Sequence, residues 1–236
     1  MQAMQNTAEE PMTEVAVTAG LAEPKPKQHA PRQPREVNPV LEKLFELHPN
    51  LFGAKFLPLK LGIFHDLLAR HPDAFKKDEL KLAMGQHARS TRYLECVAAG
   101  LARHDLDGVA VEPVAPEHVH HAILEVFRRR QARSKDDLRP RLTMLLKQAI
   151  ENSGLPLDGY ADLVRVQDEA TNALLDDAIA ELKMEAAKRE ALMETFTASG
   201  KTEAEFADMY GMDLKLVSSV LARVRAEATA KANVQT

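Results

Sequence analysis

Short apolar runs at helical spacing alternate along the chain with turns rich in Pro, Gly and polar residues. The first run follows Asn38 and Pro39, a pair typical of a helix start because Asn caps free N–H groups and Pro fits the first turn. Its apolar positions repeat at i, i+3, i+4 and i+7 and predict one buried face: Leu41, Leu44, Phe45 and His48.

Three more short helices are predicted before residue 100. The first lies within residues 58–70 and ends before Pro72, and its predicted stripe is Leu61, Phe64, Leu67 and Leu68. The second runs from about Lys77 to His87, with Lys77 and Lys81 four residues apart on the outer side and with an inner side of Leu80, Ala83 and Met84. Ser90 is the expected N-cap of the third, which carries Tyr93, Leu94 and Val97.

Residues 101–113 predict a β-hairpin. Gly100 stops the preceding helix, and two short alternating segments then flank Asp107-Gly108, a dipeptide typical of a tight hairpin turn. A helix restarts at Pro116 and ends in a basic cluster: Arg128, Arg129, Arg130 and Arg133. This cluster is either a basic patch that extends a binding surface or a solvated helix end, and the sequence leaves both open.

The rest of the chain predicts helices only. One helix is predicted at residues 141–152 and a turn at residues 153–159. A long helical stretch follows at about residues 160–198, and its part from Asp168 onward can form one continuous helix. Thr202 and Glu205 form a capping box that opens a short helix, and Gly211 separates it from a last helix. The predicted fold is therefore mainly α (α+β): a compact helical domain with one small hairpin, followed by an all-helical C-terminal region.

Composition divides the chain further. The first 35 residues are rich in Pro, Gln and Ala and predict a disordered N-terminal tail, which leaves a domain at 36–133 and a helical region at 138–230. No apolar run approaches the ~18 residues that cross a bilayer, and no signal peptide is visible, so we expect a cytoplasmic protein without a membrane partner. The single cysteine, Cys96, predicts a buried thiol without a disulfide.

Charge is distributed unevenly, although the chain as a whole carries −4. Residues 55–103 hold nine Lys or Arg against five acidic residues, a net +4, whereas residues 134–236 hold thirteen against eighteen, a net −5. Eight of the nine histidines lie between His48 and His121, so the middle of the chain gains positive charge as pH falls. A basic surface for an anionic partner is therefore expected in the middle and not in the C-terminal part.

Catalytic and metal-binding patterns do not emerge. His118, His120 and His121 lack the i, i+4 spacing of a helical ligand pair, and the twelfth position counted from Asp105 is Pro116 where a calcium loop needs Glu. The sequence contains neither a nucleophile elbow nor a Gly-rich phosphate loop. We therefore expect no cofactor, no metal and no enzymatic activity.

Several linked segments resemble the ProQ/FinO family of RNA chaperones over about residues 37–130. They are PLKLGIFHDLLAR at 58–70, ELKLAMGQHARSTRYLECVAAGLARHDLDG at 79–108 and PEHVHHA at 116–122. The resemblance implies a compact helical domain with a hairpin and a role in post-transcriptional regulation. Its implied partners are structured RNAs, namely small RNAs and messenger 3′ regions that end in a terminator-like hairpin with a single-stranded 3′ tail.

The resemblance also implies the binding residues. Family members use basic positions on a concave face, with a Tyr and an Arg near a 3′-end pocket, and the matching positions here are Lys60, Lys77, Lys81, Arg92, Tyr93, Leu94 and Arg103. Where several members carry a Thr before the Arg-Tyr-Leu triplet this chain has Ala88, which leaves Ser90 and Thr91 as the available hydroxyls.

These residue types suit RNA recognition. Flexible cations on a rigid frame pair with phosphates, a tyrosine can contact a terminal base or ribose, and free N–H groups after Ser90 can bind a phosphate oxygen.

Two alternatives concern the C-terminal region. Residues 202–225 can be interpreted as a helix-turn-helix, which would make the protein a DNA-binding transcription regulator, although the acidic surroundings oppose this. The region 138–230 can also serve as a protein interaction or self-association module attached to the RNA-binding domain. We favour this second interpretation, which is compatible with RNA binding.

Overall fold

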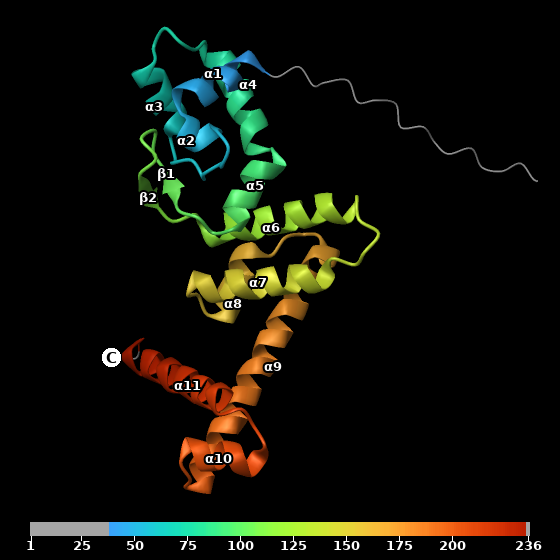
Figure 1. Cartoon of the computed structure of the whole chain (residues 1–236). Coiled ribbons are helices and arrows are strands. Elements are labelled where there is room, and N and C mark those ends of the chain that lie inside the picture. Colours follow the sequence, from blue (N-terminus) through green and yellow to red (C-terminus); the bar gives the residue numbers. More distant parts are fainter. Residues whose placement is uncertain (1–37, 235–236) are drawn as a thin grey trace, which may run out of the picture. The chain divides into compact units, whose positions relative to one another are not determined.

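The computed structural model describes residues 38–234 and places side chains through Thr229. Within this range the protein is mainly helical with one small antiparallel sheet, as expected from the sequence (Figure 1). The expected tail, residues 1–35, lies outside the described residues. None of the described helices is long and apolar enough to cross a membrane.

Five short helices precede the sheet: α1 (Pro39–Leu47), α2 (Pro49–Phe52), α3 (Ile63–Arg70), α4 (Lys77–Ala88) and α5 (Thr91–Ala98). The side chain of Asn38 accepts a hydrogen bond from the backbone N–H of Val40 at 3.0 Å and caps α1. Ser90 caps α5 in the same way, through the N–H of Tyr93 at 3.2 Å. Both predicted caps are confirmed, and each satisfies a donor that the first helical turn leaves free.

These helices pack around a first core of Leu44, Leu51, Phe52, Leu59, Ile63, Leu67, Phe75, Leu80 and Leu106. Two side chains predicted to point inward are exposed: Phe45, at 50%, and Leu61, at 62%. The buried stripe of α1 is narrower than its sequence pattern. Leu61 precedes Gly62, whose φ of 81° lets α3 begin only at Ile63, so Leu61 stays outside the helix.

The predicted hairpin is present as β1 (Arg103–His104) and β2 (Ala110–Glu112), which pair antiparallel. Between them, Gly108 adopts a φ of 77°, a backbone conformation that glycine adopts readily. The Asp105 carboxylate accepts two backbone N–H groups of the turn, at 2.9 and 3.0 Å. Leu59 adds an isolated parallel bridge to β1, so the segment before α3 is fixed against the hairpin.

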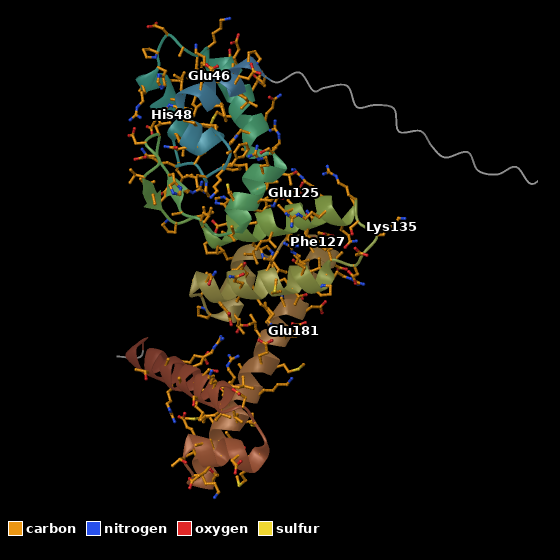
Figure 2. All side chains as sticks on the ribbon, in the orientation of Figure 1. Glu46, His48, Glu125, Phe127, Lys135 and Glu181 are labelled. Carbon is orange, nitrogen blue, oxygen red and sulfur yellow. The ribbon has the colours of Figure 1, made fainter. Side chains whose placement is uncertain are left out.

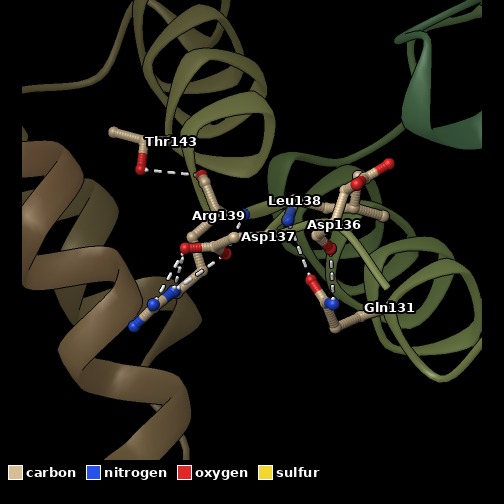
Figure 3. Close-up of polar contacts among 6 residues, drawn as sticks. All are labelled: Gln131, Asp136, Asp137, Leu138, Arg139 and Thr143. Atoms are coloured by element: carbon tan, nitrogen blue, oxygen red, sulfur yellow. Dashed lines mark hydrogen bonds and ion pairs between the residues drawn. The ribbon is translucent and has the colours of Figure 1, made fainter. Parts of the chain in front are cut away.

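Helix α6 (Pro116–Gln131) is followed by α7 (Arg139–Ser153) across an ordered connection (Figure 3). The Gln131 amide donates to the carbonyl oxygen of Asp136 and accepts the N–H of Leu138, both at 2.9 Å. The Asp137 carboxylate accepts the backbone N–H of Arg139 at 3.0 Å. Hydrogen bonds therefore fix the turn that leads the chain into α7.

The turn predicted at residues 153–159 is shorter in the structure, because α8 (Leu157–Val164) begins inside it after Pro156. The long helix predicted beyond it is interrupted at Arg165 and resumes as α9 (Glu169–Ser199), which Asp168 caps through the N–H of Thr171. α9 ends at Ser199 with Gly200 as its C-cap, one residue beyond the predicted end at 198.

The last two helices, α10 (Glu203–Tyr210) and α11 (Leu214–Val234), pack on the end of α9. The Thr202 and Glu205 capping box is confirmed, with each side chain bonded to the backbone of the other. The small core here consists of Phe206, Ala207, Val217 and Leu221.

A second, larger core extends from α5 and α6 into α7, α8 and α9. Its buried members include Val97 and Ile123 from the first two helices, and Leu146, Tyr160 and Leu175 from the others. Phe127 lies between α6 and α7 (Figure 2). The first half of the C-terminal region therefore shares a core with the helices that precede it.

Candidate nucleic-acid interface

Leu59 is the point at which three predicted site residues meet. Its backbone N–H donates to the hydroxyl oxygen of Tyr93 at 3.1 Å, and its carbonyl oxygen accepts from Arg103 Nη1 at 3.0 Å. Lys60 follows directly and donates its own N–H to the His104 carbonyl at 2.9 Å. α5, β1 and the segment before α3 thus bring Lys60, Tyr93 and Arg103 together.

The cationic groups at this point are only weakly engaged. Lys60 pairs with Asp66 at 2.9 Å, and because both side chains are more than a third exposed, the pair contributes little stability. The hydrogen bond that Lys60 donates to Asp66 raises the pKa of Lys60, which therefore stays charged. Arg103 directs its second terminal nitrogen toward His118 Nδ1, 3.3 Å away. An incoming phosphate could replace Asp66 at Lys60 at small cost.

The Tyr93 ring lies between the two cores and packs against both. Its nearest aromatic neighbour is His87, with ring centroids 4.9 Å apart. Burial raises the pKa of the Tyr93 hydroxyl, so the group remains protonated. The hydroxyl oxygen accepts from Leu59, which leaves its proton free to be donated, whereas most of the ring is committed to packing.

The start of α5 holds three further predicted residues. Ser90 Oγ is occupied as an acceptor by the N-cap bond, and Thr91 Oγ1 accepts from Arg129 Nη1 at 3.2 Å. The Leu94 side chain is partly buried against the larger core. Leu94 is therefore a packing residue in this structure, and the two hydroxyls are held by named donors.

Arg92 is exposed but anchored. Its guanidinium lies over the Phe56 ring, 4.4 Å from the centroid, and donates to the carbonyl oxygens of Gly53 and Ala54. These contacts hold a cation on the loop that follows α2, from which one guanidinium edge can still reach solvent.

Lys77 and Lys81 lie on the exposed side of α4, as predicted. Among the described residues, neither takes part in an ion pair, and the neighbouring pair on this helix joins Lys76 to Glu79. No hydrogen bond or ion pair of the described residues joins them to Leu59 and its partners. They are exposed cations on a neighbouring helix and do not belong to the same bonded group.

Three of the four arginines in the cluster on α6 have partners within the protein. Arg128 donates to Thr171 Oγ1 at 2.7 Å, Arg129 to the Arg89 carbonyl at 2.8 Å, and Arg130 to Glu95 Oε1 at 2.7 Å. These bonds tie α6 to α9, to the end of α4 and to α5. Their partners lie 35 or more residues away in the chain, so no local sequence pattern could have revealed them.

His87 is a further residue that the sequence did not single out. It is buried, its ring contacts Phe52, Phe56 and Tyr93, and its Nε2 has no hydrogen-bond partner. Burial, with a smaller contribution from the Arg92 charge, lowers the pKa of His87 to about 4. It therefore supports the Tyr93 ring as a neutral group.

His118 and His120 contact different partners. His118 lies at Arg103, whereas His120 is buried and 3.2 Å from the Tyr160 hydroxyl. No group of three His, Cys, Asp or Glu side chains among residues 38–229 is arranged to hold a metal ion. Cys96 is buried and unpaired, and burial raises the pKa of its thiol to about 12.

Comparison with known proteins agrees with this domain. A family model described as the ProQ/FINO family matches residues 34–139. The RNA chaperone ProQ of Shewanella pealeana is 42% identical over 91 residues, covering 37% of this chain and 43% of that protein. The RNA chaperone ProQ of Idiomarina loihiensis is 42% identical over 87 residues, covering 35% and 42%. The chain thus spans less than half the length of these curated relatives.

Two solved structures are also similar. The solution structure of a ProQ homolog from Legionella pneumophila is 30% identical and covers 47% of this chain and 97% of that one, with a TM-score of 0.34. The crystal structure of a FinO-like RNA chaperone from Neisseria meningitidis is 29% identical and covers 35% and 85%, with a TM-score of 0.33.

The fold and the site describe one class of protein: a small helical domain with a two-stranded hairpin and with exposed cations beside that hairpin. The family model and the 42% identity of the ProQ sequences make the assignment specific. The chain belongs to the ProQ/FinO family, and residues 34–139 are the part that carries the match.

Proposed function

We propose that this protein is an RNA chaperone, acting in post-transcriptional regulation, that binds structured RNA ending in a hairpin with a single-stranded 3′ tail. The observation that carries the proposal is that Tyr93 and Arg103 both bond to the backbone of Leu59, directly before Lys60. Two cations and a hydroxyl proton are then available beside Leu59, which suits the last phosphodiester and the terminal ribose of the RNA.

The proposed binding surface extends from this point in two directions. The start of α5 adds Ser90, Thr91 and Arg92, and the exposed side of α4 adds Lys77 and Lys81. A-form RNA hides its base edges in a deep groove, so cations that follow its phosphates recognise shape rather than sequence. Leu94 contributes by packing behind the surface. The proposed activity is RNA binding, in line with the curated relatives, which are named RNA chaperones.

The proposal is tested with the full chain and three ligands: a hairpin RNA with a 3′ uridine tail, the same RNA with a 3′ phosphate, and duplex DNA of similar length. We expect the free 3′ end to bind most tightly and DNA to bind least. Equal affinity for DNA would contradict RNA recognition, and equal affinity for the two RNAs would contradict the 3′-end pocket.

Salt dependence separates phosphate contacts from packing effects. Lys81→Ala should weaken binding to both RNAs alike and lower the slope of log affinity against log salt by about one. Lys201→Ala is the matched control, because it removes the same charge from an exposed site between α9 and α10. An unchanged slope for Lys81→Ala would exclude a phosphate contact at this position.

The helix-turn-helix alternative finds little support in the side chains of α10 and α11. Arg223 pairs with Glu151 and Glu227, and Arg225 pairs with Glu203. DNA backbone binding needs an excess of cations, and residues 134–236 carry a net charge of −5. We therefore propose protein interaction or self-association as the role of α10 and α11, whereas α7, α8 and the first half of α9 contribute to the shared core.

A further inference from the structure

Arg129 holds the chain on both sides of the α5 N-cap. Its Nη1 donates to the carbonyl oxygen of Arg89 at 2.8 Å and to Thr91 Oγ1 at 3.2 Å, and Ser90 lies between these two residues. One guanidinium from α6 therefore fixes the backbone just before the cap and the side chain just after it.

The guanidinium is itself oriented. Arg129 Nε donates to Glu125 Oε1 at 2.8 Å, one turn earlier on α6, and each of these side chains is 28% exposed. Figure 2 labels Glu125 on α6. A planar guanidinium held at one edge by a carboxylate presents its other edge in a fixed direction, which a flexible lysine does not. The contact to α5 is therefore preorganised.

The contact also determines how Thr91 can interact with a ligand. A hydroxyl has one proton to donate and accepts through its oxygen, and the Thr91 oxygen already accepts from Arg129. The Ser90 oxygen is occupied in the same way by the N–H of Tyr93. Each hydroxyl still has its proton to donate, which suits an oxygen atom of the terminal ribose.

We infer that Arg129 is a positioning residue for recognition of the RNA 3′ end, acting by fixing the start of α5 and orienting the Thr91 hydroxyl as a donor. The inference rests on the proposed function and assigns part of its 3′-end specificity to α6. Arg129 acts through Thr91 and Arg89 rather than by touching the RNA. Its neighbours cannot replace it, because Arg128 bonds to Thr171 and Arg130 to Glu95.

The test compares Arg129→Gln with Arg130→Gln in the full chain. Both variants remove one charge and one α6 to α5 tie, but only the first tie reaches residues 89–91. The readout is the ratio of affinities for the hairpin RNA with a free 3′ hydroxyl and with a 3′ phosphate. We expect Arg129→Gln to lower this ratio roughly fivefold, as for loss of one positioned hydrogen bond, and Arg130→Gln to leave it unchanged.

Two further variants protect the test from a folding defect. Glu125→Gln leaves Arg129 in place but weakens its anchor, so it should lower the ratio by a smaller factor. Thr91→Val should lower the ratio as much as Arg129→Gln does. The double variant should lose no more than either single variant, because both changes remove the same Arg129–Thr91 interaction. Urea midpoints identify any variant that loses stability.

The possible results distinguish failure of the proposed function from failure of the inference about Arg129. If the wild type binds free and blocked RNA equally, the 3′-end part of the proposed function fails and the inference fails with it. If the wild-type preference survives in Arg129→Gln, the inference alone is overturned. An equal loss in Arg130→Gln, or additive losses in the double variant, would also overturn it, since a general loosening of α5 would then explain the effect.

Discussion

Tyr93 combines a structural contact with a proposed binding contact in one side chain. Its ring packs against both cores, and its hydroxyl oxygen accepts the N–H of the buried Leu59. Truncation to Ala would leave a cavity between the cores, so a loss of RNA binding in that variant would mix folding with recognition. Phe keeps the ring and removes only the hydroxyl.

Tyr93→Phe should therefore destabilise the protein by about 1–2 kcal/mol, because the Leu59 N–H would lose its partner in a buried position. Urea unfolding of the full chain measures this change. RNA affinity, determined well below the unfolding transition, then reports the contribution of the hydroxyl to binding. An unchanged midpoint would mean that water replaces the hydroxyl and that Leu59 is not fixed by Tyr93.

Buried His87 makes stability depend on pH. Its folded pKa, about 4, lies below the ordinary histidine value of 6.5, so the folded state binds fewer protons and loses stability as pH falls from 6.5 toward 4. We expect His87→Phe to recover about 2 kcal/mol of the stability lost between pH 7.5 and pH 5. His120, whose pKa burial also lowers to about 4, should preserve the rest of the dependence.

The control for this prediction is His121→Gln, which changes an exposed imidazole on α6. Urea midpoints at pH 7.5 and pH 5 are compared for the two variants and the wild type. If His87→Phe loses as much stability as the wild type on acidification, then His87 is not held neutral by its aromatic surroundings.

For single residues, the sequence predicted which residues belong to the candidate site better than it predicted the contacts that they make. Resemblance selected Lys60, Tyr93 and Arg103, and the structure brings them together at Leu59. The positioning role of Arg129 could not be predicted from the sequence. Its hydrogen-bond partners lie 38 and 40 residues away in the chain, and no periodic pattern marks such a long-range contact. Phe45 was wrongly predicted to be buried. Helical spacing shows which side of a helix is apolar, but not how much of that side is covered by the rest of the protein.

At the scale of helices, capping residues made the boundaries predictable. Asn38, Ser90 and Thr202 each begin a helix as expected, because each offers an oxygen to N–H groups that the first turn leaves free. α8 was predicted only in part. It is eight residues long and carries Gly159, and helices of that length depend on tertiary packing, here of Tyr160 into the larger core.

The capping box of α10 is testable by itself. Thr202→Ala removes the acceptor for the Glu205 N–H and should weaken α10 by about 1 kcal/mol. Hydrogen exchange should quicken in α10 and in the part of α11 that packs on it, with α1 to α5 unaffected. Thr195→Ala, on the exposed side of α9, is the control and should change little. Uniformly faster exchange along the chain would contradict a local effect.

At the scale of the molecule, the family match and the folded core end at different places. The match stops at residue 139, but the larger core continues through α7 and α8 to Leu182 of α9. Tyr160 of α8, which is fully buried, reaches back to His120 of α6. The division predicted between 133 and 138 remains a prediction of domain organisation, and a shared core crosses it.

A truncation measures how much the domain depends on those helices. A chain of residues 34–139 keeps the matched region but uncovers the face of α6 that carries Val119, Ala122 and Ile123. Exposing two or three such side chains should cost roughly 3–6 kcal/mol relative to a chain of residues 34–201, which keeps α7, α8 and α9.

The two truncated chains are compared by urea unfolding and by binding of a dye that fluoresces on apolar surfaces. We expect the shorter chain to unfold at lower urea and to bind the dye, since it retains the α6 face without its cover. Equal midpoints, with no dye binding, would mean that α5 and α6 repack without α7. The RNA-binding surface would then be independent of the C-terminal helices.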